Sequence, residues 1–169
     1  MVKTENRSRP EMDLHSGGRR VLIIEAPYYQ EITDELIGGA RAVLDAAGVG
    51  YDRLPVPGAL EIPQAFAQAA TAGLFGGKGE AVYAGAIILG CVIRGETSHY
   101  DIVCNNTNHW VMETAIHHNI PVGNGVLTVD TEAQALARAR GGADGKGGDA
   151  ARAVLRLIKV EHDFGLTRS

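Results

Sequence analysis

The chain has 169 residues, a formal net charge of −4, 45% hydrophobic residues and only 5% aromatic residues. This length suits one domain with a substantial core, and the acidic balance lacks the basic footprint of a nucleic-acid-binding protein. No apolar stretch approaches the roughly 20 residues of a membrane-spanning helix, and the N-terminus lacks the apolar segment of a signal peptide, so we expect neither a membrane nor a nucleic-acid partner.

Polar residues fill positions 1–18, which we interpret as a flexible arm ahead of a single domain at 19–163 and a tail at 164–169. Short β-branched runs then alternate with longer stretches of helical periodicity. The expected strands are 21–24, 51–56, 82–91 and 121–129, and the expected helices are 32–47, 60–74, 100–118, 132–139 and 148–160. This alternation predicts an α/β fold with a parallel sheet covered on both faces.

In parallel sheets, ligands bind beyond the carboxyl ends of the strands. This rule selects four segments: 25–30, 56–61, 91–99 and 124–130. The third is the most informative, because the sequence G-C-V-I-R-G-E-T-S-H-Y-D at 90–101 follows an apolar strand and leads into a helix. Such a turn offers backbone N–H groups and a helix dipole to an anion, so it predicts a site for a small phosphorylated substrate.

Within this turn, Gly95 permits close backbone approach and Thr97 adds a hydroxyl. Ser98 is a candidate helix cap, with Asp101 in the first turn. His99 brings a group that titrates near neutral pH. Alternatively, His99 is simply an early helical residue between a cap and a counter-charge.

The other loops leave alternatives open. Glu61 either complements the helix dipole or accepts hydrogen bonds from a polyol. Tyr28 and Tyr29 either cover the core or stack on a planar heterocycle. Asn124 is unusual inside a strand, so its amide needs a backbone or ligand partner. Arg138, like Lys146 in a glycine-rich loop, is either a surface charge or a phosphate contact.

Cofactors are not expected. Cys91 and Cys104 are the only cysteines, and we interpret them as reduced thiols of a cytoplasmic protein. The six histidines are scattered, which argues against a metal site. Neither a Walker A motif nor Gly-x-Gly-x-x-Gly follows a strand, so no nucleotide cofactor is predicted.

Three segments together resemble the 6,7-dimethyl-8-ribityllumazine synthase family: V-P-G-A-L-E-I-P at 56–63, the turn at 90–101, and P-V-G-N-G-V-L-T at 121–128. The resemblance implies a flavodoxin-like three-layer α/β/α sandwich with a four-stranded parallel sheet, and active sites between subunits of a homopentamer. The homo-oligomer is either a single pentamer or an assembly of pentamers, since some relatives pack twelve pentamers into a hollow shell. It also implies condensation of 5-amino-6-(D-ribitylamino)uracil with 3,4-dihydroxy-2-butanone 4-phosphate, the penultimate step of riboflavin biosynthesis, without a cofactor.

The same resemblance implies a role for each matching position. Tyr28 stacks on the pyrimidine, whose remaining contacts come from the backbone at Cys91, Val92 and Ile93. The ribityl chain lies along Ala59, Leu60 and Glu61, and the phosphate is held by Glu96 and Thr97. A neighbouring subunit supplies Asn124 and Arg138, and His99 shuttles protons.

Many relatives carry phenylalanine at the position of Asn124 and phenylalanine or tryptophan at that of Tyr28. Tyrosine still stacks, whereas Asn124 makes the neighbour's contribution more polar. Two rival functions remain: a non-catalytic lumazine- or flavin-binding or shell-forming paralogue, and a riboflavin synthase of the related pentameric type. His99, Arg138 and the Gly95–Thr97 turn favour the synthase, since neither rival needs a phosphate site.

Overall fold

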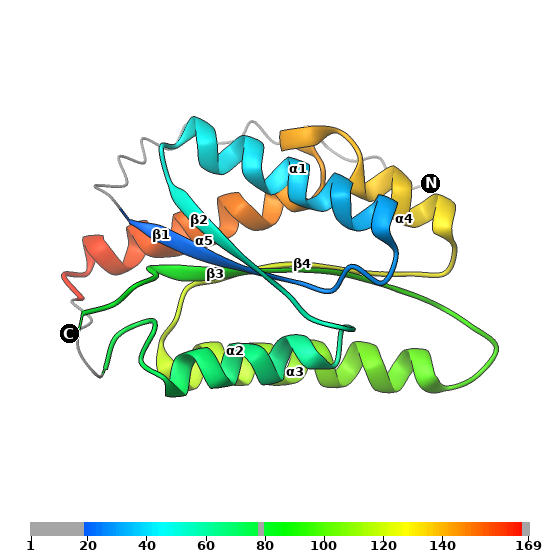
Figure 1. Cartoon of the computed structure of the whole chain (residues 1–169), viewed down its shortest axis with the longest axis horizontal. Coiled ribbons are helices and arrows are strands. Elements are labelled where there is room, and N and C mark those ends of the chain that lie inside the picture. The colour runs from blue at the N-terminus through cyan, green and yellow to red at the C-terminus, as the bar shows by residue number, and fades with distance from the viewer. Residues whose placement is uncertain (1–18, 78–79, 167–169) are drawn as a thin grey trace.

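The computed structural model describes residues 19–77 and 80–166, so the arm expected over residues 1–18 lies outside the described part. Four parallel strands form one sheet in the order β2-β1-β3-β4 (Figure 1). The strands are β1 (Arg20–Glu25), β2 (Gly50–Pro55), β3 (Gly85–Ile93) and β4 (Val122–Val129). The predicted parallel α/β fold is confirmed.

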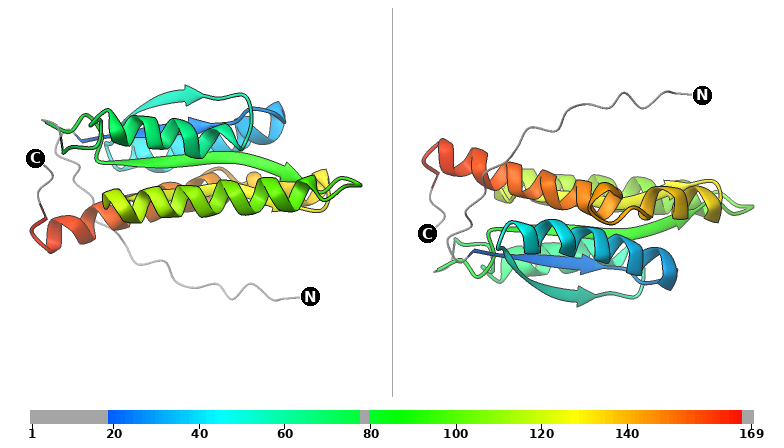
Figure 2. Two further views of the ribbon diagram at one scale, coloured as in Figure 1. Left: turned by 90° about the horizontal axis from the view of Figure 1, so that it is seen from below. Right: turned by 90° about the horizontal axis from the view of Figure 1, so that it is seen from above.

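Helices cover both faces of the sheet, which gives the three layers that the resemblance implied (Figures 1 and 2). On one face lie α1 (Gln30–Ala46), α4 (Glu132–Ala139) and α5 (Lys146–Asp163), with the short 3-10 helix η1 (Gly142–Asp144) before α5. On the other face lie α2 (Glu61–Thr71) and α3 (His99–His118).

β1, β3 and β4 are mostly apolar and buried because helices cover both sides of this part of the sheet. The edge strand β2 is largely exposed and carries Asp52 and Arg53. In β1, Val21 and Ile23 join the core cluster on the side of α1 and α5, whereas Leu22 and Ile24 join the cluster on the side of α2. β1, β3 and β4 therefore each contribute residues to two separate cores, one on either side of the sheet.

Several predicted boundaries need correction. The third strand begins at Gly85 rather than at residue 82, and it runs on to Ile93. Lys146, expected in a loop, is the first residue of α5. The glycines after it are helical because α5 packs very closely: a Cβ on Gly147 would lie 1.8 Å from the carbonyl oxygen of Leu36 in α1. Local glycine content favours a loop, but here close helix packing requires the glycines.

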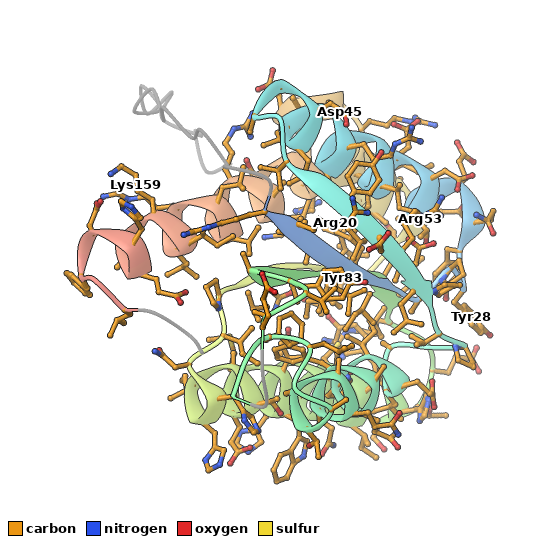
Figure 3. All side chains as sticks on the ribbon, turned by 60° about the vertical axis from the view of Figure 1, so that its left-hand side comes forward. Arg20, Tyr28, Asp45, Arg53, Tyr83 and Lys159 are labelled. Atoms are coloured by element: carbon orange, nitrogen blue, oxygen red, sulfur yellow. The ribbon has the colours of Figure 1, made fainter. Side chains whose placement is uncertain are left out.

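An ion pair between Glu25 and Arg53 joins β1 to β2 near the carboxyl end of the sheet. The side chain of Glu25, at the end of β1, is only 4% exposed and accepts hydrogen bonds from Nε and Nη2 of Arg53 on β2, at 3.0 and 2.5 Å. A buried carboxylate requires such partners. The pair lies immediately before the loop that carries Tyr28, which projects beyond the end of β1 (Figure 3).

Candidate active site

A cleft of about 340 Å³ lies at the carboxyl ends of the strands, where the rule for parallel sheets places a ligand. It is bounded by the loops after β1 and β2, by the end of β3 and by the start of α3. Its lining residues are Tyr28, Tyr29, Gly58, Ala59, Leu60, Glu61, Cys91, Val92, Ile93, Gly95, Thr97, His99, Tyr100 and Val103. Three loops far apart in the sequence thus meet at one site.

The two tyrosines after β1 have different environments. Tyr29 packs against the core cluster and is partly buried, whereas Tyr28 is 74% exposed. Their rings meet edge to face, with centroids 5.0 Å apart and an interplanar angle of 72°. Tyr29 therefore covers the core and supports Tyr28, whose ring face remains available for stacking.

Glu61 begins α2 and is half-buried in the cleft wall. Its backbone N–H donates to the Gly58 carbonyl at 3.1 Å, which closes the turn ahead of the helix. A Cβ on Gly58 would lie 3.0 Å from Glu61 Oε2, so the carboxylate sits directly over the turn. This position suits both interpretations of Glu61, because the carboxylate complements the helix dipole and also faces ligand space.

The end of β3 supplies the floor of the cleft. Cys91 is buried, and burial raises the pKa of its thiol to about 11. The thiol is therefore neutral near pH 7 and is not an activated nucleophile. Val92 and Ile93 are half-buried beside it, so this wall presents apolar side chains and strand backbone to a ligand.

The turn between β3 and α3 is exposed throughout residues 94–99. Nothing lies within 4 Å of a Cβ built on Gly95, so a ligand can approach its backbone closely. Ser98 occupies the N-cap position without a side-chain capping bond, which corrects the expected role. Instead the Thr97 hydroxyl accepts from the backbone N–H of His99 at 3.3 Å. His99 is the first residue of α3 and lines the cleft.

Three predicted site residues do not line the cleft of their own chain. Glu96 is exposed outside the lining, and Arg138 is exposed on α4, where its Nη1 donates to the Gln134 carbonyl at 3.0 Å. Asn124 is satisfied internally: its Nδ2 donates to Asn108 Oδ1 at 2.7 Å, and its Oδ1 accepts from the Val126 N–H at 3.0 Å. The contribution of Asn124 and Arg138 to the site of a neighbouring subunit stays a prediction, as does the contact of Glu96 with the phosphate through its backbone N–H.

Tyr100 and Val103 also line the cleft, although sequence reasoning did not select them. Both lie in the first turns of α3, and Val103 is one helical turn beyond His99. Helical spacing from His99 is the signal that points to Val103.

Within residues 19–77 and 80–166, no group of three or more histidine, cysteine, aspartate or glutamate side chains is arranged to hold a metal ion. In the same ranges, no helix has the length and apolar character needed to cross a bilayer. The polar groups that line the cleft are tyrosine hydroxyls, the Glu61 carboxylate, the Thr97 hydroxyl and the His99 imidazole.

Comparisons with known proteins identify the family. Residues 18–162 match the sequence model of 6,7-dimethyl-8-ribityllumazine synthase. The synthase of Azorhizobium caulinodans is 49% identical over 144 residues, which cover 85% of this chain and 87% of that protein. The synthase of Xanthobacter autotrophicus is 48% identical over 162 residues, 95% of this chain and 96% of that protein. The chain belongs to the 6,7-dimethyl-8-ribityllumazine synthase family.

Proposed function

We propose that this chain condenses 5-amino-6-(D-ribitylamino)uracil with 3,4-dihydroxy-2-butanone 4-phosphate to give 6,7-dimethyl-8-ribityllumazine, phosphate and water. One observation carries the proposal: a stacking ring, a carboxylate and an exposed glycine-containing turn with a histidine line a single cleft. These groups correspond to the heterocycle, the polyol and the phosphate of the two substrates. Family membership supports the same reaction.

The pyrimidine stacks on Tyr28 and lies against the backbone of Cys91, Val92 and Ile93. Its ribityl chain runs along Ala59 and Leu60 to Glu61, whose carboxylate accepts hydroxyl hydrogen bonds. Within the described part of the chain, the Glu61 side chain has no hydrogen-bond or ion-pair partner that would compete. The phosphate of the second substrate binds at the N–H groups of the turn containing Glu96 and Thr97.

His99 moves the protons. The 5-amino group attacks the ketone, and loss of water gives an imine. Removal of the C3 proton then expels phosphate from C4 and leaves an enol, which tautomerises to a ketone at C3 as C4 takes up a proton. Attack of the ribitylamino nitrogen on this new carbonyl closes the ring with loss of a second water. Each step needs a group that both accepts and donates a proton, which the imidazole of His99 in the cleft provides.

The active site is shared between subunits of a homopentamer. No lysine or arginine is among the described residues that line the cleft, so the phosphate charge requires a cation from elsewhere. Arg138 of a neighbouring subunit supplies it, together with Asn124. Exposed apolar side chains on α3 support such an interface, since Ile102 is 53%, Trp110 49% and Ile116 74% exposed.

The reaction is tested by mixing the purified protein with both substrates and following lumazine fluorescence. Formation no faster than the uncatalysed background would contradict the proposal. If supplied lumazine binds and its fluorescence is merely quenched, the protein is a binding paralogue. Inorganic phosphate at millimolar concentration is expected to compete with the butanone phosphate but not with the pyrimidine.

The shared site is tested by subunit complementation. Arg138→Ala should raise the KM for the butanone phosphate far more than the KM for the pyrimidine, while Arg156→Ala on α5 serves as the control. Co-expression of a His99→Ala chain with an Arg138→Ala chain should restore activity, because some sites then combine an intact His99 with an intact Arg138. Sedimentation should give five copies per particle, or a multiple of five if pentamers assemble further. Absence of complementation in a mixed pentamer would place Arg138 outside a shared site.

The cytoplasmic location expected from the two thiols belongs to the same proposal. Cys91 and Cys104 are both free cysteines, as expected in a reducing compartment.

A further inference from the structure

Arg94 is the cation of the turn between β3 and α3, yet its side chain is engaged away from the cleft. Its Nε donates to Asp130 Oδ1 at 2.9 Å, and its Nη1 lies 3.8 Å from Asp101 Oδ1. The guanidinium also lies over the ring of Tyr100, with Cζ 4.1 Å from the ring centroid. Neither Arg94 nor Asp130 lines the cleft.

The partners of Arg94 belong to different elements. Tyr100 and Asp101 are in the first turn of α3, whereas Asp130 directly follows β4. The backbone repeats the link, because the Arg94 N–H donates to the carbonyl of Val129 at 2.9 Å. One residue therefore ties the turn both to the start of α3 and to the end of β4.

Asp130 is itself held in place. Its backbone N–H donates to Gln134 Oε1 at 2.8 Å, and the Gln134 N–H donates to the Thr131 hydroxyl at 3.2 Å, which caps α4. The carboxylate that binds Arg94 thus belongs to the ordered start of α4. A fixed acceptor can orient a guanidinium, since the planar fork of donors loses little freedom on pairing.

The turn needs such support because it has little packing of its own. Residues 94–99 are all exposed, and the Cβ position of Gly95 faces open space. Backbone N–H donors are effective for an anion only when their directions are fixed before it binds.

We propose that Arg94 is a positioning residue: clamped by Asp130, Asp101 and the ring of Tyr100, it holds the N–H groups at Gly95–Thr97 and the His99 side chain in the geometry that binds the phosphorylated substrate. The inference rests on the proposed function, which it deepens by assigning the support of the phosphate site. Arg94 acts through the turn and does not contact the phosphate.

Arg94→Met is expected to raise both the KM for the butanone phosphate and the inhibition constant of inorganic phosphate by about 10- to 100-fold, the size of effect that a displacement of about 1 Å produces at a site. The KM for the pyrimidine should change less than about twofold, because Tyr28 and Glu61 are held by other elements. A merely structural role would raise both KM values together. Arg94→Lys should rescue only part of the loss, since lysine keeps the charge but not the fork or the stacked plane.

Asp130→Ala separates positioning from direct contact. Positioning requires that this variant lose phosphate affinity as Arg94→Met does, and that the double variant lose little more than either single one. Direct contact predicts the opposite, because Asp130→Ala would release the guanidinium toward the anion. Unchanged or tighter phosphate binding by Asp130→Ala overturns the proposal, as does full rescue by Arg94→Lys.

The Arg20–Asp52 pair provides matched controls. It is a comparable exposed arginine–carboxylate pair, with 43% and 48% of the side chains exposed, and Arg20 begins β1 at the opposite end of the sheet. Arg20→Met and Asp52→Ala should leave both KM values unchanged. Amide hydrogen exchange without substrate should be faster over residues 94–103 in Arg94→Met but not in Arg20→Met.

This exchange experiment and a calorimetric titration with inorganic phosphate need no turnover. If the wild-type protein makes no lumazine, the proposed function fails, while these two measurements still test the positioning role of Arg94. If the wild type is active and Arg94→Met keeps the wild-type phosphate affinity and exchange rates, the positioning role of Arg94 is refuted and the proposed function stands.

Discussion

Replacing Arg53 by methionine removes the partner of a buried carboxylate. Glu25 has 4% of its side chain exposed and receives both of its side-chain hydrogen bonds in the described structure from Arg53. The pair is tight, and the hydrogen bond to Glu25 raises the pKa of the Arg53 guanidinium. In the variant, a carboxylate remains between β1 and α1 without a donor.

The expected loss follows from this burial. Removing one member of a buried ion pair typically costs about 3–5 kcal/mol, because the other charge is left uncompensated. The Arg53 side chain is 45% exposed, so its truncation admits some water to Glu25, and we expect the lower end, about 3 kcal/mol. For a domain of this size each kcal/mol lowers Tm by about 2–4 °C, which gives a decrease of roughly 6–12 °C.

Thermal and urea unfolding, followed by circular dichroism at one protein concentration, measure the effect. Arg20→Met is the control, because its partner Asp52 is 48% exposed and an exposed pair contributes about 1 kcal/mol or less. The double variant Glu25→Leu/Arg53→Met should recover most of the stability, since both charges are then absent. A Tm decrease for Arg53→Met no larger than that of Arg20→Met would refute the reasoning.

Three other predictions concern the site and the packing beneath it. His99→Ala should lower kcat by about 10²–10⁴-fold with little change in pyrimidine KM, and a loss below tenfold in steady-state assays would remove His99 as the proton shuttle. Burial raises the pKa of the Cys91 thiol from about 9 to about 11. The neutral buried thiol therefore contributes fully to the free energy of unfolding below pH 9, and this contribution is lost as the pH rises toward 11. Over this interval the free energy of unfolding should fall more steeply in the wild type than in Cys91→Ala. A Cβ on Gly123 would lie 1.9 Å from the Ala150 carbonyl oxygen, so Gly123→Ala should cost about 3 kcal/mol or more in urea unfolding, whereas Gly38→Ala, with open space around its Cβ, should stabilise α1 by roughly 0.5–1 kcal/mol.

Local periodicity predicted the elements well where their signals were strong. The helix at Glu132–Ala139 has the predicted bounds, and Gly48, with a φ of 66°, follows the end of α1 as expected. The predicted start of α5 was wrong because the two glycines after Lys146 have weak helix propensity. Gly147 is required because α5 lies in close contact with α1. A contact between segments that are distant in the sequence leaves no local signal.

The candidate site was predictable because parallel topology brings strand ends together. Tyr28, Glu61 and His99 follow three different strands, and the carboxyl-end rule predicted that they would share one cleft, which they do. The environment of Asn124 was not predictable, because its partner Asn108 lies 16 residues earlier on α3. The sequence indicated only that the amide needed partners.

By itself, the sequence determined the α/β class, the order of the elements and the residue types at the strand ends, because these depend on short-range pattern and on the rule of parallel sheets. Only the tertiary structure decided which of these side chains are engaged by other elements and which remain exposed at the cleft. It packed Tyr29 against the core and left Tyr28 exposed at the cleft, and it turned Arg94 from the cleft toward Asp130. The reason is physical: a side chain's orientation depends on the partners that folding brings to it from other elements, and these contacts lie beyond the range of any local pattern.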